Sequence, residues 1–246
     1  MLEYHTPVRF YLGANTPVGF VGYLDDLYSA ADGWQAYIIK SGPGTGKASL
    51  MRAVMNTMAE LGQEPEAIYC SSDPRSLDGV LFPQLKIGIM DGTSPHIMEP
   101  KNWGAVEQIV NLSDCMDGEM LHKQYKEIIA ATDACSGMHA RCRKFMSAAA
   151  SLLGDSTRIA QDCTDVPKVI RTAERIADRE FAGLHPGRGK EKRRFLSAIT
   201  PEGPVIFHQT LQTLCSRIYA IEDEYGAASR LLLAELRGRA LAAGLE

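Results

Sequence analysis

WQAYIIKSGPGTGKASL, residues 34–50, is the stretch on which the fold prediction rests. A short apolar run, WQAYIIK, leads into a glycine-rich segment, and apolar residues at helical spacing follow as far as Gly62. Strand, glycine loop and helix in this order are the context of a phosphate-binding loop, because free N–H groups at a helix N-terminus can hold an anion. The stretch therefore predicts an α/β fold with a phosphate site where the helix begins.

The glycine-rich segment departs from the pattern G-x-x-x-x-G-K-[ST] at two positions. Gly46 and Lys47 match it, but Ser41 replaces the leading glycine and Ala48 replaces the hydroxyl residue. A small residue suffices at the first position, whereas a methyl group cannot ligate Mg²⁺. Ser49, one place further on, is the candidate replacement for the hydroxyl. The residues predicted to contact a nucleotide are Gly42, Pro43, Gly44, Thr45, Gly46, Lys47, Ala48 and Ser49.

Other apolar segments predict how the rest of the chain is organised. We expect a capped helix from Thr16 to about Gly33, and a long helical insertion at about 104–183. Besides 34–40, the expected strands are 66–70, 86–91, 194–200 and 217–222, and a helix ends the sequence. Strands separated by helices imply a mostly parallel sheet covered on both faces. The prediction is a single P-loop NTPase-like domain, residues 1–246, with five strands.

An internal repeat relates the two ends of the chain. TPVGFVGYLDDL (16–27) is echoed by TPEGPVIFHQTL (200–211), and the apolar runs AYIIK and IYAIE follow the two copies. Where the first copy continues into the glycine-rich loop, the second has DEYGAAS (223–229), without the lysine and with one glycine. Residues 200–246 are therefore predicted to be a degenerate half-repeat without phosphate chemistry, and its IYAIE strand is expected in the same sheet.

Charged residues outside the loop supply further candidates. Asp91 ends the apolar strand 86–91, where a carboxylate beside a phosphate loop can hold Mg²⁺. The alternative is a turn-forming aspartate before Gly92. Asp73 lies in SSDPRSLDG (71–79) with Arg75 and Asp78, and these residues are either positioned to orient an acceptor or water, or part of a solvated turn.

The basic segment HPGRGKEKRRF (185–195) is a second candidate group. Arg188 and Arg193 belong to it, and arginines can close over a transferring phosphoryl group. A solvated basic loop, or a docking patch for an acidic partner or nucleic acid, explains the same cluster.

The composition sets the broader expectations. The chain of 246 residues has 45% hydrophobic and 23% charged residues and a net charge of −4, so nucleic acid is an unlikely partner. The sequence shows no leader-like segment and no apolar stretch long enough to span a membrane, which predicts a cytoplasmic protein. Its six cysteines form no C-x-x-C pair and are predicted to be reduced and mostly buried.

Several of these segments together resemble a known family. The elements S-S-D-P, S-L-D-G and D-G-T-x-P-H in residues 71–96, with SAITPEG (197–203), are similar to an uncharacterised family of tandem P-loop ATPases from spore-forming and related Gram-positive bacteria. The resemblance implies nucleotide contacts by the glycine-rich loop and marks family-like positions of unassigned role at Asp73, Asp78, Asp91 and His96. The chain departs from the family at Ala48, in its eroded second loop, and by stopping where the second half should continue.

The sequence thus predicts binding of ATP, or of GTP, with Mg²⁺ and slow or partner-stimulated hydrolysis. In this hypothesis Lys47 neutralises phosphate oxygens, Ser49 and Asp91 hold Mg²⁺, and an arginine of 188–194 stabilises the transition state. One alternative is a nucleotide or small-molecule kinase, because adenylate kinases resemble the chain in placing a hydroxyl two residues after the lysine. Another is a non-catalytic module whose nucleotide-bound shape is recognised by a protein partner.

Overall fold

The computed structural model describes residues 6, 8–94 and 97–245. The chain divides into two compact units. The first comprises Met1–Arg143 and Arg194–Ile218, and the second comprises Lys144–Arg193 and Tyr219–Glu246. Each unit is considered by itself below.

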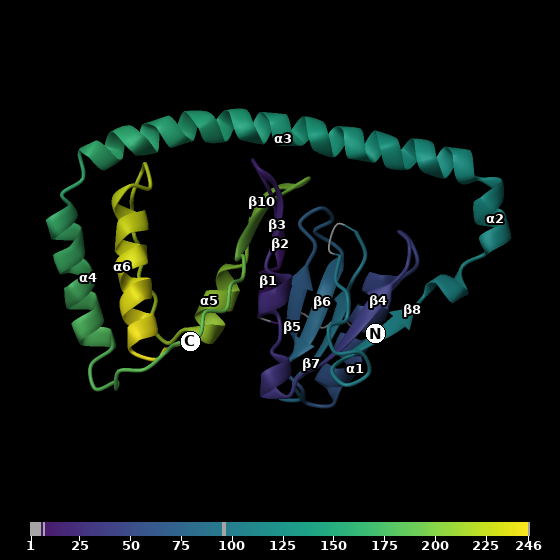
Figure 1. Cartoon of the computed structure of the whole chain (residues 1–246), viewed down its shortest axis with the longest axis horizontal. Helices are drawn as coiled ribbons and strands as arrows, with labels where there is room; N and C mark the ends of the chain where they lie inside the picture. The colour runs from purple at the N-terminus through teal and green to yellow at the C-terminus, as the bar shows by residue number, and fades with distance from the viewer. Residues whose placement is uncertain (1–5, 7, 95–96, 246) are drawn as a thin grey trace. The chain divides into compact units, whose positions relative to one another are not determined.

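The first unit is built on a six-stranded sheet (Figure 1). Its strands, in spatial order, are β1 (Arg9–Tyr11), β5 (Glu66–Tyr69), β6 (Leu77–Phe82), β7 (Ile87–Asp91), β4 (Gln35–Lys40) and β8 (Glu107–Asn111). All neighbours pair in parallel except β6, which is antiparallel to both β5 and β7. The expected mostly parallel sheet is confirmed, but it has six strands and a mixed orientation.

The extra central strand, β6, lies in a region that we expected to be a loop and a turn. Short connections join it to its two neighbours, and short connections favour antiparallel pairing. All six of its residues are buried. A strand that is buried on both faces lacks the alternation of polar and apolar residues by which strands are recognised in a sequence.

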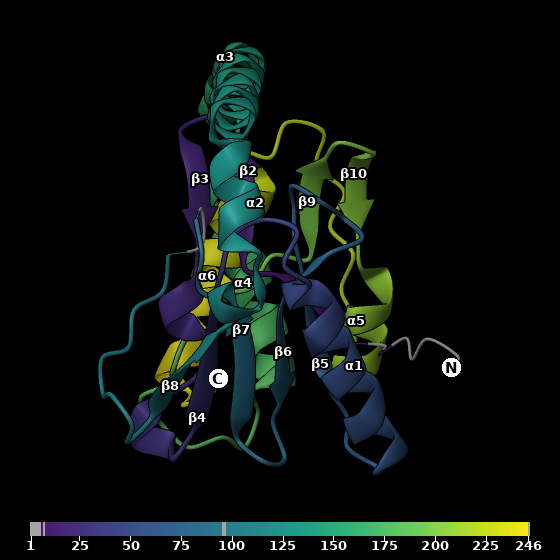
Figure 2. The ribbon, with the colours of Figure 1, turned by 90° about the vertical axis from the view of Figure 1, so that its right-hand side faces the viewer.

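One face of the sheet is covered by α1 (Lys47–Glu60), as Figure 2 shows. Met51 and Met55 of this helix are fully buried against the sheet residues Ile39, Val80 and Phe82. Successive side chains of a strand point to opposite faces, so Ile38 of β4 belongs to the other face.

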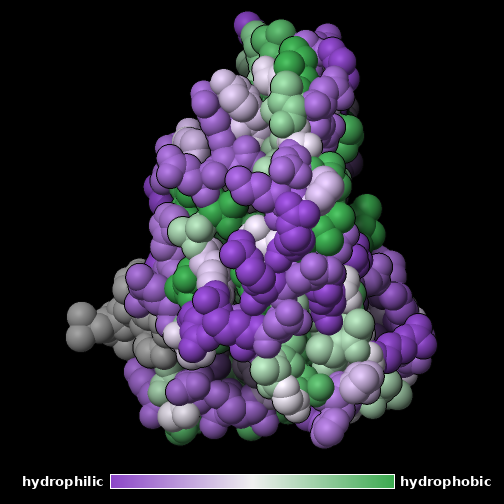
Figure 3. All heavy atoms as spheres, turned by 90° about the vertical axis from the view of Figure 1, so that its left-hand side faces the viewer, coloured by the Kyte–Doolittle hydropathy of each residue, from purple (hydrophilic) through white to green (hydrophobic). Residues whose placement is uncertain are grey.

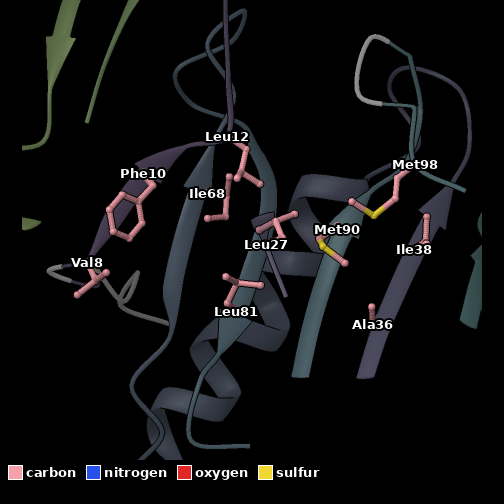
Figure 4. Close-up of a cluster of buried hydrophobic side chains, with 10 residues drawn as sticks. All are labelled: Val8, Phe10, Leu12, Leu27, Ala36, Ile38, Ile68, Leu81, Met90 and Met98. Atoms are coloured by element: carbon pink, nitrogen blue, oxygen red, sulfur yellow. The ribbon is translucent and has the colours of Figure 1, made fainter. Parts of the chain in front are cut away.

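Among the described residues, that other face is covered by irregular segments and a 3₁₀ turn, with no residue of an α-helix in its cluster. Its cluster comprises Val8, Phe10, Leu12, Leu27, Ala36, Ile38, Ile68, Leu81, Met90 and Met98 (Figure 4). The covering residues Leu27 and Met98 come from connecting segments, and Leu24 lies in the short 3₁₀ turn η1 (Leu24–Asp26). The prediction of helices on both faces is therefore wrong for this sheet, because apolar loop residues bury the second face.

The repeated T-P-x-G sequence forms two similar β-hairpins. β2 (Gly13–Thr16) pairs with β3 (Gly19–Gly22), and β9 (Ser197–Thr200) pairs with β10 (Gly203–Ile206). In each turn the threonine hydroxyl donates to the carbonyl oxygen of the glycine, and both glycines have positive φ, 125° and 101°. The repeat is thus a hairpin turn, and the helix expected from Thr16 to about Gly33 is wrong.

Several other expected boundaries also differ. Residues 107–111 form the edge strand β8, so the helical insertion begins at Gly118 and not at about 104. Residues 217–222 form no strand and join no sheet, which contradicts the prediction for IYAIE. The remaining elements are η2 (Ala30–Asp32), η3 (Ser113–Cys115), α2 (Gly118–Lys123), α3 (Tyr125–Asp162), α4 (Val166–Glu180), α5 (His208–Leu214) and α6 (Ala228–Ala242).

The second unit is a small helical assembly in which α4 packs on α6. Its buried residues, within the part that the structure describes, are Thr157, Ala173, Ala177 and Ala227. None of them is a large apolar residue. Hydrophobic residues instead lie at the surface among hydrophilic ones on the face that holds α4 (Figure 3).

Candidate functional site

The carboxyl end of β4 brings three segments together. β4 lies between two parallel neighbours, with Ile39 opposite Asp91 of β7 and Lys40 opposite Asn111 of β8. The glycine-rich loop leaves this end of β4. Because the carboxyl ends of parallel strands share one edge of the sheet, the loop is flanked by the residues that follow β7 and β8.

The loop has the conformation that its glycines permit. Gly44 and Gly46 have φ values of 77° and 85°, which side chains other than glycine rarely adopt. The Thr45 hydroxyl donates to the Gly42 carbonyl oxygen at 2.9 Å. Gly46 is the N-cap of α1 and offers no side chain to the first helical N–H groups. The helix dipole and these N–H groups favour an anion at this position.

Lys47 folds back over the loop. Its Nζ donates to the carbonyl oxygens of Gly42 at 2.9 Å and Ser41 at 3.2 Å, and lies 3.5 Å from Oδ2 of Asp91. The side chains of Lys47 and Asp91 are only 12% and 15% exposed. The ammonium group is therefore held close to the helix N-terminus, where phosphate oxygens could replace its carbonyl partners.

Asp91 forms the turn that was one of the two roles considered for it. Its Oδ1 accepts from the backbone N–H of Thr93 at 2.9 Å and also from the Thr93 hydroxyl. This turn fixes the carboxylate, and the second oxygen faces Lys47. Asp91 is thus a turn former whose side chain also reaches the loop.

The two hydroxyl candidates after the lysine differ in their surroundings. The Ala48 methyl group is half-buried against the apolar cluster between α1 and the sheet, whereas Ser49 is exposed. Among the residues that the structure describes, no group of three His, Cys, Asp or Glu could hold a metal ion. The two oxygen donors that the sequence assigned to Mg²⁺ are thus one carboxylate, already held by Thr93 and Lys47, and one exposed serine hydroxyl.

Two residues at the site were not predicted. Thr93 fixes Asp91, and the D-G-T sequence could have suggested this turn. Met116 follows β8, and its sulfur accepts from the Ser41 hydroxyl at 3.7 Å. Nothing in the sequence points to Met116, since a contact across 75 residues depends on the tertiary fold.

Asp73 and Asp78 lie in different environments. Asp73 is exposed, and its Oδ1 accepts from the backbone N–H of Arg75 at 3.2 Å, as expected of a solvated turn. Asp78 lies in β6 and is buried. Burial, followed by the charge of nearby Asp78, raises the pKa of Cys70 to about 12. The other five cysteines are exposed, so the prediction of mostly buried cysteines is wrong.

Two of the predicted arginines belong to a different unit from the loop. Arg188 and Arg193 belong to the second unit, whereas the glycine-rich loop belongs to the first. Arg194 is in the first unit, where its guanidinium donates to the carbonyl oxygens of Asp26 at 2.8 Å and Leu27 at 3.2 Å. Burial lowers the pKa of Arg194, and its contacts are structural. His96 lies outside the described residues.

The shortened second loop, residues 223–229, carries its own anion. The Asp223 carboxylate accepts from the backbone N–H groups of Tyr225 at 3.2 Å, Gly226 at 3.0 Å and Ser229 at 2.7 Å. These hydrogen bonds, above all the one from Ser229, lower the pKa of Asp223. A carboxylate of the chain thus occupies the position at the start of α6 that a phosphate would need.

No helix among the described residues combines the length and the apolar character that crossing a membrane requires. Comparisons of the chain with models of protein families, with curated proteins and with solved structures found no match.

Proposed function

We propose that residues 41–49 bind the phosphates of ATP, or of GTP, together with Mg²⁺, and that the protein hydrolyses the nucleotide slowly or when a partner stimulates it. The observation that supports this most is the position of Lys47. Its ammonium group is poised over a glycine loop at a helix N-terminus, 3.5 Å from a carboxylate at the end of the neighbouring strand. We also propose that this chain belongs to the tandem P-loop ATPase family that its sequence resembles.

The comparison of the two loops favours an external anion at the first one. Three backbone N–H groups of the second loop bind Asp223. The first loop contains no acidic residue between Ser41 and Ser49, and Asp91, a carboxylate from outside the loop, contacts the lysine. A phosphate group would satisfy both the helix N-terminus and the lysine.

In the proposed complex each residue has a defined task. Lys47 exchanges the carbonyl oxygens of Ser41 and Gly42 for β- and γ-phosphate oxygens. Asp91, held by Thr93, becomes available to Mg²⁺ directly or through water. The metal ion supplies positive charge that offsets the charge developing on the phosphates.

A second candidate, nucleotide binding without turnover, is favoured by the environment of Ala48. The methyl group of Ala48 packs against the apolar cluster, and the exposed Ser49 is the nearest hydroxyl after the lysine. A site with few metal ligands stabilises bound phosphate better than a transition state. Release of inorganic phosphate from ATP distinguishes the two candidates, and transfer to an added acceptor would indicate the kinase alternative.

The proposal is tested by titrating Mg-ATP into the wild type and the Lys47→Ala variant in a calorimeter. We expect the substitution to weaken binding by about 10-fold to 100-fold, because charge-assisted hydrogen bonds contribute roughly 1.5–3 kcal/mol. Lys86→Ala is the matched control. Lys86 is exposed before β7, at the other end of that strand from Asp91, and donates to Asp32. Equal affinity of wild type and Lys47→Ala would refute a phosphate loop.

A further inference from the structure

The first unit contains a cavity of about 580 Å³ that the nucleotide site does not use. One of its walls is the segment around η1, with Leu24 and Tyr28, and the other is residues 97–102. Glu107, the first residue of β8, also lines it and pairs in register with Ala36 of β4. Since Ala36 belongs to the core cluster on the sheet face opposite α1, Glu107 lies on that face too. It is also at the amino end of its strand, whereas the glycine-rich loop follows the carboxyl end of β4.

Glu107 places a carboxylate between the two walls. Its Oε1 accepts from the Tyr28 hydroxyl at 2.9 Å, and its Oε2 accepts from the backbone N–H of Asn102 at 2.7 Å. The residue is only 2% exposed. An ionised carboxylate can accept about four hydrogen bonds. Glu107 can therefore take further donors from a group in the cavity.

The two groups that donate to Glu107 are neutral. Burial, followed by the hydrogen bond to Glu107 and the charge of that residue, raises the pKa of Tyr28. The phenol therefore keeps its proton and remains a donor. The second donor is a backbone N–H group, which carries no net charge. Glu107 is thus a buried acidic residue held in place by neutral donors.

The lysines near the cavity are engaged by other carboxylates. Nζ of Lys101 lies 2.6 Å from Oδ1 of Asp25, and Nζ of Lys40 lies 2.5 Å from Oε1 of Glu99. The hydrogen bond to Asp25 is the main cause of the raised pKa of Lys101, and the charge of Glu107 contributes least. Within the described part of the chain, no lysine or arginine forms an ion pair with Glu107. A buried carboxylate without a counter-ion is costly, so a cation in the cavity would be stabilised there.

The remaining lining suits an apolar group beside the cation. Leu24, Met98 and Pro100 are apolar residues of the two walls. Met98 also belongs to the core cluster drawn in Figure 4, and Leu24 and Tyr28 pack against that cluster. Walls anchored in the core favour a cavity that exists before a ligand arrives, and its volume is in the range of small-molecule sites.

We propose that this cavity binds a small organic cation, an amine or a guanidinium on a short apolar chain or ring, whose N–H groups donate to Glu107. Three of the four charged lining residues are acidic, which disfavours an anion. A metal ion would need more ligands, since no group of three His, Cys, Asp or Glu among the described residues could hold one. The proposal does not depend on nucleotide binding at the glycine-rich loop.

The proposal is tested by titrating the ¹⁵N-labelled full chain with phenethylamine, with agmatine and with 2-phenylethanol, the uncharged analogue of phenethylamine. We expect phenethylamine or agmatine to give saturable shifts of the Asn102 amide resonance, because this N–H donates to Glu107. The alcohol should bind about 10-fold to 100-fold more weakly than phenethylamine, since it lacks a charge-assisted hydrogen bond. Absence of saturable binding by both cations would overturn the proposal, as would equal affinity for the alcohol.

Two variants separate the charge of Glu107 from its structural contacts. Glu107→Gln removes the charge and should weaken binding of the cation by about 10-fold to 100-fold. Tyr28→Phe removes one neutral donor, leaves the carboxylate to the ligand and should strengthen binding by roughly 2-fold to 10-fold. Glu64→Gln is the control, the same change at an exposed residue that accepts from Gln84 outside the cavity, and should leave the affinity unaltered.

Circular dichroism checks that each variant folds. If Glu107→Gln does not fold, the comparison of phenethylamine with the alcohol on the wild type and the effect of Tyr28→Phe decide the question. Equal weakening by Glu107→Gln and Tyr28→Phe would show that the hydrogen bond between them only holds the two walls together, and would overturn the assigned role of the charge.

Discussion

Lys47 and Asp223 show how single residues distinguish two similar loops. Each lies near the N-terminus of a helix, but the lysine adds positive charge to its loop while the aspartate supplies an anion from within the chain. The first loop was predictable because its residues are adjacent in sequence and glycine, lysine and threonine there have separate physical roles. Met116 was not predictable, since it reaches Ser41 only through the tertiary fold.

Substitutions of the glycines in the first loop test its described conformation. Gly46 has a φ of 85°, so Gly46→Ala should destabilise the protein by about 1–2 kcal/mol and weaken nucleotide binding. Gly42→Ala is the control, because an added Cβ would meet the Met116 methyl group at an ordinary 3.6 Å. Urea unfolding and calorimetry measure the two effects. Equal stability of the two variants would contradict the described loop conformation.

At the scale of elements, the sequence predicted best where a pattern is local. The strand, loop and helix around residues 35–60 were predicted because one face of each element is apolar and a glycine loop separates them. β6 was missed because it is buried throughout, and the T-P-x-G turn that begins at Thr16 was mistaken for a helix start. Threonine followed by proline occurs both at helix N-termini and in hairpin turns. Here the glycine two residues after the proline, Gly19 or Gly203, has a positive φ and forms a hairpin turn.

The packing of α1 against the sheet predicts which substitutions in this helix destabilise the protein. Met51 is fully buried in the cluster between them, so Met51→Ala should lower the free energy of unfolding by about 2–5 kcal/mol. Leu50, its neighbour on the helix, is 38% exposed, and Leu50→Ala should cost below about 1 kcal/mol. Chemical unfolding, followed by fluorescence, measures the free energy of unfolding of both variants. Similar losses from both variants would show that α1 is rotated relative to this description.

The two units differ in what holds them together. The sheet unit buries large side chains such as Tyr11, Phe82 and Ile38, whereas the helical unit buries only alanines and a threonine among its described residues. Because burial of large apolar side chains is the main stabilising contribution, the helical unit has little intrinsic stability. Composition alone could not predict this, since apolar residues are frequent in both parts of the chain.

Hydrogen exchange tests the difference in stability between the two units. We expect backbone amides of β4 and β7 to exchange slowest, through global unfolding, and amides of α4 and α6 to exchange at least 100-fold faster through local opening. Mass spectrometry of proteolytic peptides measures the rates. Protection of α4 and α6 equal to that of the central strands would contradict the account of the second unit.

The central claim, that the first loop binds phosphate and the second does not, is tested most directly by one titration. Mg-ATP is added to ¹⁵N-labelled protein, and the backbone amide resonances of both loops are followed. The account predicts large, saturable shifts for Gly44, Gly46 and Lys47, and none for Gly226 and Ser229, whose N–H groups already bind Asp223. Absence of shifts in the first loop, or equal shifts in both, would contradict it.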